Sequence, residues 1–137
     1  MGVTRKVRRY APEAVAGGLC HRRLLNVDRR RHRLTLAWAF SDAAGADGTP
    51  DFGVALLILD ATVGQLAEAL GLTLGPRLHC AFRGGVPSPG ETGLWSETTV
   101  RPLGDQWVLE AVLRDPLAPD GPALEGTFLF ERADADA

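Results

Sequence analysis

Cysteine and long apolar runs are scarce in this sequence of 137 residues. The two cysteines, Cys20 and Cys80, lie far apart and form no CxxC pair, which favours reduced thiols over a disulfide framework. The opening stretch, MGVTRKVRRY, lacks the apolar segment of a signal peptide. The longest apolar run, Val54 to Leu59, ends at Asp60, well short of the roughly 20 residues that a membrane span requires. We therefore expect a cytoplasmic protein with no membrane partner.

An excess of charge of one sign is also missing, because the formal net charge is only −2. This balance removes any global electrostatic argument for nucleic acid as a partner. The basic residues are nevertheless crowded into RKVRR (5–9) and RRRHR (29–33), and the acidic end ERADADA offsets them. His21 and His32 have no carboxylate or cysteine spaced to join them. We predict no metal site and no cofactor.

The sequence does contain enough apolar residues, 45%, for one continuous core. We assign residues 1–132 to a single domain and residues 133–137 to a disordered acidic tail. A short helix is expected at 11–15, followed by two strands at 19–27 and 33–40 with a charged hairpin turn between them. After a loop, a helix is expected from about 53 to 70. Further strands are expected at 77–82, 94–101, 107–114 and 124–130.

The helix is the most informative of these elements. Its first half, VALLIL, is apolar all round, which predicts a helix enclosed by other elements. Asp60 is unexpected there, because burying an unpaired carboxylate costs several kcal/mol. Asp60 must lie at a wet or hydrogen-bonded surface, or at a working site. The order of elements predicts an α+β fold in which a curved antiparallel sheet wraps one long helix.

The stretches DFGVALLILDATVG, VPSPGETGLWSETTV and LEGTFLFER, together with this order of elements, resemble the hotdog-fold acyl-CoA thioesterases. The resemblance is strongest to the phenylacetyl-CoA and 4-hydroxybenzoyl-CoA thioesterase branch, and it covers most of the chain. It implies a hotdog fold and hydrolysis of an acyl-CoA or acyl-carrier thioester. Coenzyme A would then be part of the substrate rather than a cofactor. The resemblance also implies a homodimer or homotetramer.

The resemblance places the chemistry at the helix. Asp60 falls where the family carries its catalytic carboxylate, and Phe52 and Gly53 fall where backbone N–H groups form an oxyanion hole. Asp60 would attack the carbonyl or activate water, across a dimer interface. Its alternative role is a hydrogen bond to a backbone or hydroxyl group at a subunit contact. Asp51 and Phe52 replace the first two residues of the family's HGG motif, so only Gly53 remains of it.

Four further residues are assigned to substrate binding, each with a structural alternative. Asp51 can instead cap the helix, Thr62 can bond back to its own turn, and His79 can be an ordinary polar strand residue. Arg83 can hold the phosphates of coenzyme A, as can the arginines of the 29–33 turn, or all of these can be solvated surface residues. Trp38, Trp95 and Trp107 can fill the core or an interface, or line an acyl pocket.

Three other functions stay open on the sequence. A hotdog domain that binds an acyl-CoA or lipid-like ligand without turnover is favoured by DFG in place of HGG. A dehydratase or hydratase on the same fold ranks lower, because its motifs are not found. A purely structural interaction protein would be favoured if Asp60 lay exposed and away from any cleft.

Overall fold

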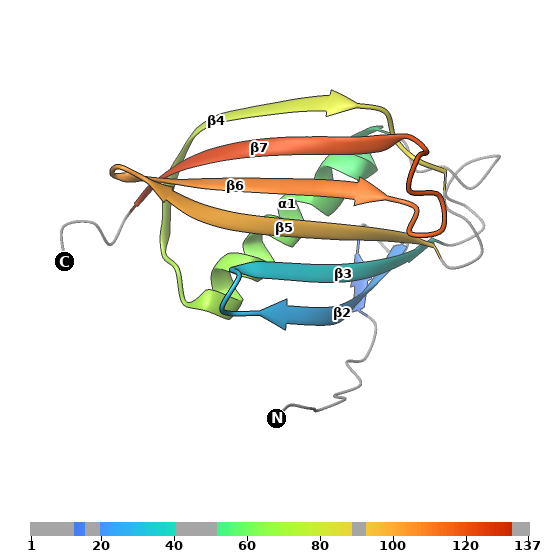
Figure 1. The fold of residues 1–137 in the computed structure, drawn as a ribbon, viewed down its shortest axis with the longest axis horizontal. Helices are drawn as coiled ribbons and strands as arrows, with labels where there is room; N and C mark the ends of the chain where they lie inside the picture. The colour runs from blue at the N-terminus through green and yellow to red at the C-terminus, as the bar shows by residue number, and fades with distance from the viewer. Residues whose placement is uncertain (1–12, 16–19, 41–51, 89–92, 133–137) are drawn as a thin grey trace.

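The computed structural model describes residues 13–15, 20–40, 52–88 and 93–132. One helix lies against a seven-stranded sheet in which every pair of neighbouring strands is antiparallel. The strands lie in the order β1-β2-β3-β5-β6-β7-β4, so the chain passes from β3, the third strand of the sheet, to β4 at its far edge. Figure 1 shows the sheet curving in front of α1. The elements are β1 (Glu13–Val15), β2 (Cys20–Asp28), β3 (Arg33–Phe40), α1 (Phe52–Leu70), β4 (Leu74–Gly84), β5 (Leu94–Leu103), β6 (Gln106–Arg114) and β7 (Ala123–Arg132).

The predicted α+β arrangement is confirmed, and so is each of the predicted long elements. The short helix expected at 11–15 is wrong, because Glu13–Val15 is a strand that pairs with the start of β2. A helix of one turn fixes several residues for a single hydrogen bond, whereas the same residues extend an existing sheet at little cost. The expected cap Asp51 and the tail 133–137 lie outside the described residues.

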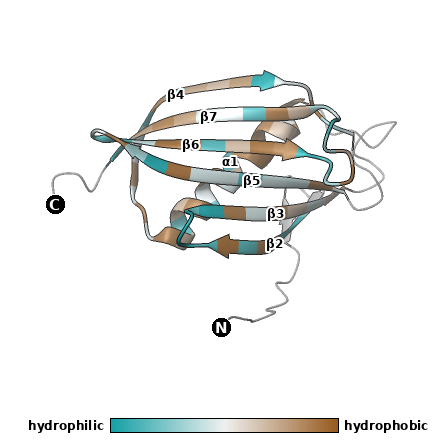
Figure 2. Ribbon diagram, in the orientation of Figure 1, coloured by the Kyte–Doolittle hydropathy of each residue, from teal (hydrophilic) through white to brown (hydrophobic). Residues whose placement is uncertain are grey.

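Alternation along the strands separates an inner face, against α1, from an outer face. In β3 the side chains of Leu34, Leu36 and Trp38 are buried, and Arg33 and Ala39 on the other face are exposed. Figure 2 shows the corresponding change between hydrophobic and hydrophilic residues along several strands. The helix packs against β3, β5 and β6 through one stripe. That stripe consists of Ala55, Ile58, Leu59, Thr62, Val63, Leu66 and Ala67.

A chain of buried hydrogen bonds joins the helix to the sheet. The indole N–H of Trp38 donates to the Ser96 hydroxyl at 2.7 Å, and the Ser96 and Thr62 hydroxyls are also 2.7 Å apart. The Thr62 hydroxyl donates to the carbonyl of Ile58 at 2.7 Å. Since each hydroxyl has one hydrogen, the Ser96 hydroxyl must donate to Thr62. Every polar group in this chain is then satisfied, which fixes the position of α1 on the sheet.

The carboxyl end of α1 is closed by a glycine cap and by an arginine. Gly71 has a φ of 69°, and the N–H of Leu72 donates to the carbonyl of Ala67 at 2.8 Å, as in a Schellman motif. The guanidinium of Arg29, from the β2–β3 turn, donates to the carbonyl of Ala69. A cation at this end also complements the helix dipole. The arginine-rich turn therefore lies at the opposite end of α1 from Phe52.

By length and composition alone, α1 is apolar enough to cross a membrane. The core helix of a sheet-wrapped fold has the same properties, and α1 buries its apolar stripe against the sheet. Burial against the sheet thus explains the apolar stripe, while the exposed Phe52 and Leu57 lie outside it.

Candidate active site

Asp60 lies on the side of α1 that the sheet does not cover. Its side chain is 58% exposed, and its carboxylate is 3.4 Å from the guanidinium of Arg77 in β4. The neighbouring helix positions Leu59 and Thr62 are fully buried, so the helix turns Asp60 outward while it holds the core. The aspartate within the apolar run of the helix is therefore not a buried charge. It is an exposed carboxylate paired with an arginine.

Arg77 is an arginine whose pairing with Asp60 could not be predicted from the sequence. It lies 17 residues after Asp60, in a strand paired with β7 at the edge of the sheet. The pairing register shifts on both sides of Arg77, between Leu74 and Arg77 and again between Arg77 and His79. Such irregularities bend a strand and change the direction of a side chain. Here they accompany a guanidinium that reaches back to the helix.

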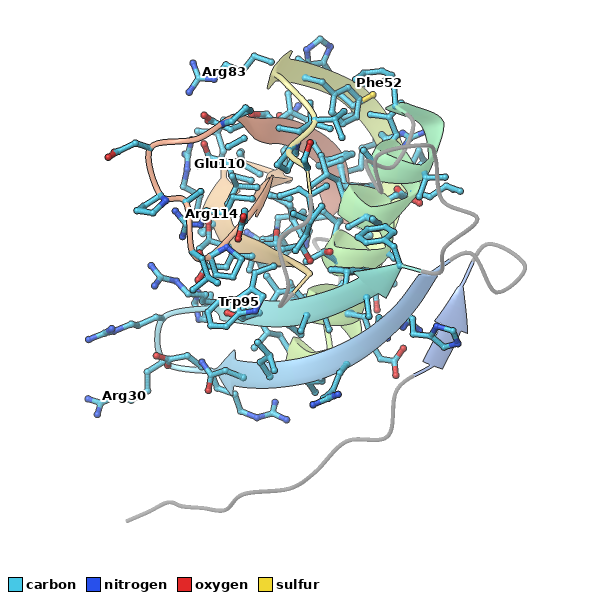
Figure 3. All side chains as sticks on the ribbon, turned by 90° about the vertical axis from the view of Figure 1, so that its right-hand side faces the viewer. Arg30, Phe52, Arg83, Trp95, Glu110 and Arg114 are labelled. Carbon is cyan, nitrogen blue, oxygen red and sulfur yellow. The ribbon has the colours of Figure 1, made fainter. Side chains whose placement is uncertain are left out.

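The amino end of α1 begins with two exposed residues. Phe52 is 53% exposed and Gly53 is also exposed, and the first backbone N–H groups of a helix have no partner within the helix itself. Figure 3 shows Phe52 at this end of the helix, on the opposite side of the sheet from Arg83, Glu110 and Arg114. Free N–H groups and the positive end of the helix dipole together can stabilise an oxyanion.

These two groups cannot act on one carbonyl within a single chain. Gly53 and Asp60 are seven residues apart, which separates them by about 10 Å along the helix axis at 1.5 Å per residue. A carbonyl that accepts a hydrogen bond from the amide and meets the carboxylate needs both within about 3 Å of the reacting atoms. If both groups take part in one reaction, each chain presents one half-site at the amino end of α1 and another at Asp60.

The exposed side of α1 is more apolar than that of a helix facing water. Leu57, one turn before Asp60, is 53% exposed, as is Phe52, and Leu78 in β4 is 46% exposed. The apolar first half predicted a helix enclosed by other elements, and within the described chain this is wrong for these positions. The sheet covers only one side of α1, so anything that covers the other side has to come from outside the described residues.

The other predicted site residues do not gather around Asp60. Thr62 is fully buried and bonds to Ile58 and Ser96, so its position gives no support to a substrate-binding role. Arg83 pairs with Glu125 of β7 at 2.9 Å, on the outer face of the sheet. His79 is exposed in β4 and pairs in register with Leu129, two positions after Arg77 along the strand.

The outer face carries a regular arrangement of charges rather than a catalytic cluster. Arg83 pairs with Glu125, Arg114 with Glu97, and Arg101 with Glu110. Within the residues that the structure describes, no group of His, Cys, Asp and Glu side chains comes together in a way that could hold a metal ion.

The architecture is that of a hotdog fold, with one long helix held against a curved antiparallel sheet. No protein-family model and no curated protein matches the chain. Solved structures do. The protein smu.793 from Streptococcus mutans UA159, bound to acetyl-CoA, is similar with a TM-score of 0.60 at 13% identity, over 79% of this chain and 85% of that one.

Two further structures support the same fold. A hypothetical thioesterase from Streptococcus pneumoniae TIGR4, solved with coenzyme A, has a TM-score of 0.61 at 12% identity, over 80% of this chain and 84% of that one. Protein RHA08564, a thioesterase superfamily protein, has a TM-score of 0.53 at 17% identity. The similarity to RHA08564 covers 87% of this chain but only 54% of that one. The chain thus shares the fold of these proteins.

Proposed function

We propose that this chain is a homodimeric thioesterase that hydrolyses an acyl-CoA or acyl-carrier thioester. Asp60 of one protomer would face the amino end of α1 in the other. The separation of about 10 Å between Gly53 and Asp60 carries this proposal, because a second copy can bring together groups that one chain keeps apart. The edge strand β4, which has no further neighbour among the described residues, and the exposed apolar side chains Phe52 and Leu57 offer a surface for that copy.

The chemistry follows from the groups on each side. The carbonyl oxygen of the thioester accepts hydrogen bonds from the Phe52 and Gly53 amides, which stabilise the oxyanion as it forms. The Asp60 carboxylate either attacks the carbonyl carbon, giving an anhydride that water opens, or takes a proton from the attacking water. In both routes the carbon–sulfur bond breaks and the thiol leaves with a proton. Two similar structures hold acetyl-CoA or coenzyme A, which supports coenzyme A as the carrier. The cytoplasm is the proposed location.

The first test is steady-state hydrolysis of short, long and aromatic acyl-CoAs by the native chain and by Asp60→Asn. This substitution keeps the shape of the side chain and removes its charge, so the rate should fall at least about 100-fold. Glu68→Gln is the matched control, since it removes an exposed carboxylate from the same helix two turns further on. Equal activity of native chain and Asp60→Asn would refute the catalytic role.

The dimeric site has its own test. Gly53→Pro removes the amide N–H in the first turn of α1, where proline is tolerated, and should inactivate the protein. When Gly53→Pro and Asp60→Asn chains are unfolded together and refolded, half of the dimers are mixed, and each mixed dimer has one intact site. About a quarter of the native activity should return. No recovery, with mixed dimers shown by mass spectrometry, would mean that the site does not cross between chains.

A second candidate is a domain that binds an acyl-CoA without turnover. The ion pair between Asp60 and Arg77 favours it, because a carboxylate held by an arginine is less free to attack. A bulky Phe52 in place of glycine beside the oxyanion position points the same way. This function would be supported if the native chain and Asp60→Asn both bound coenzyme A in calorimetry and neither hydrolysed any thioester.

A further inference from the structure

A trough of about 490 Å³ lies on the outer face of the sheet, at the end of β2, β3 and β5. Its floor is made of small residues of β3, and its walls come from the two neighbouring strands. Six of its residues matter for what it can bind: His21, Arg23, Leu25, Ala37, Ala39 and Trp95. The trough faces away from α1, since Ala37 and Ala39 alternate with the buried Trp38.

The register places the two walls at a definite spacing. Arg23 pairs with Ala37, and Ala37 pairs with Trp95, so these residues form one row across three strands. Neighbouring strands are about 4.8 Å apart, which puts Arg23 and Trp95 about 10 Å apart across the methyl group of Ala37. A flat ring in van der Waals contact with a planar group on each side needs about 7 to 8 Å between those groups. A backbone spacing of about 10 Å therefore leaves room for one ring between the two side chains.

The chemistry of the walls selects the ligand. The Trp95 side chain is 38% exposed, which is unusual for so large an apolar group, and its indole face is a stacking surface. Arg23 and His21 supply N–H donors at the opposite wall, and no ion pair is recorded for either side chain within the described residues. Among the described residues, no acidic side chain lines the trough. On the far side of Trp95, the residue that pairs with it in β6 is Arg114, whose guanidinium donates to the carboxylate of Glu97.

We propose that this trough binds a planar aromatic group that carries a negative charge, stacked between Trp95 and Arg23 above Ala37. The anionic substituent extends towards Arg23 and His21, where charge-assisted hydrogen bonds hold it. The apolar ring covers Ala37 and Leu25, which are otherwise in contact with water. The proposal is independent of thioester hydrolysis, because the trough and Asp60 lie on opposite faces of the sheet.

The test compares four small probes by calorimetry. Adenosine 5′-monophosphate and 1-naphthoate carry both a ring and a charge, and at least one of them should bind. Adenosine has the ring alone and ribose 5-phosphate has the charge alone, so both should bind at least about tenfold more weakly than the nucleotide. Binding of naphthoate but not of the nucleotide would identify an aromatic acid as the ligand. Binding of the nucleotide but not of naphthoate would identify a nucleotide. Failure of both charged probes would overturn the proposal.

The site is located by spectroscopy and by substitution. The sequence has three tryptophans, so a proton–nitrogen spectrum contains three indole signals, and only that of Trp95 should move on titration. Trp95→Leu and Arg23→Gln should each weaken binding about tenfold or more. Arg30→Gln, in the hairpin turn (Figure 3), and Asp60→Asn, on the helix, should leave it unchanged. Unchanged affinity in Trp95→Leu, or loss of affinity in Asp60→Asn, would refute the assignment to the trough.

Discussion

The buried chain from Trp38 through Ser96 and Thr62 to Ile58 leads to a prediction about coupling. Thr62→Val keeps the volume of the side chain but leaves the Ser96 hydroxyl without an acceptor. Ser96→Ala leaves the indole N–H of Trp38 without an acceptor. Both groups are fully enclosed, and a stranded buried donor costs about 1 to 3 kcal/mol. Each substitution alone should therefore lower the free energy of unfolding by about 1 to 2 kcal/mol.

The double variant tests whether Thr62 and Ser96 belong to one chain of hydrogen bonds. Once Ser96 is alanine, Thr62→Val strands no further donor, so the double variant should be about as stable as Ser96→Ala alone. The coupling energy is then about 1 kcal/mol or more. Urea denaturation followed by tryptophan fluorescence measures it. Thr98 bonds separately to the carbonyl of Glu110, so Thr98→Val paired with Thr62→Val is the additive control. Additivity within about 0.5 kcal/mol for Ser96 and Thr62 would refute the assigned chain.

Three further substitutions test other contacts. Arg29→Met removes the guanidinium that caps the last turn of α1, and should lower the free energy of unfolding by about 0.5 kcal/mol, an effect that high salt reduces. Gly126→Ala would place a Cβ 3.0 Å from the ring of Phe82, so urea denaturation should show a loss of about 1 to 3 kcal/mol. Arg77→Met removes the cationic partner of the Asp60 carboxylate. On the thioesterase proposal kcat should change, while the free energy of unfolding stays within about 0.5 kcal/mol of the native value. Unchanged kinetics would mean that Arg77 is not part of the site.

Local patterns were enough to predict the core of this fold. The alternation in RLTLAWAF and the helical pattern ending at Gly71 each describe a segment whose neighbours are fixed by burial. β1 could not be predicted because three residues carry almost no periodicity. They form a strand because they pair with the edge of the sheet at β2, and not because of their own strand propensity. β4 begins at Leu74, three residues before the predicted start at 77, so Gly75 and Pro76 lie within the strand.

The contacts at both proposed sites depend on which strands become neighbours. Arg77 reaches Asp60 only because β4 crosses the sheet to pair with β7 and its register shifts there. The trough exists only because β3 lies between β2 and β5, which sets Arg23 and Trp95 on either side of Ala37. Neither pair of neighbours can be predicted from the local sequence. Sequence periodicity indicates which face of the sheet a side chain lies on, but not which residue lies beside it on the next strand.

The apolar helix shows most clearly what a sequence pattern leaves open. Apolar residues all round α1 predict that every side of the helix is covered, yet Phe52 and Leu57 are half exposed in one chain. The pattern is the same whether the cover comes from the chain itself or from another copy. The distance between Gly53 and Asp60 adds an independent argument, because it leaves the reacting groups of one chain too far apart. A single partner that buried this side of α1 and supplied the missing half-site would account for both. If the protein is a monomer at working concentration, Asp60 is an exposed surface carboxylate and the thioesterase proposal loses its support.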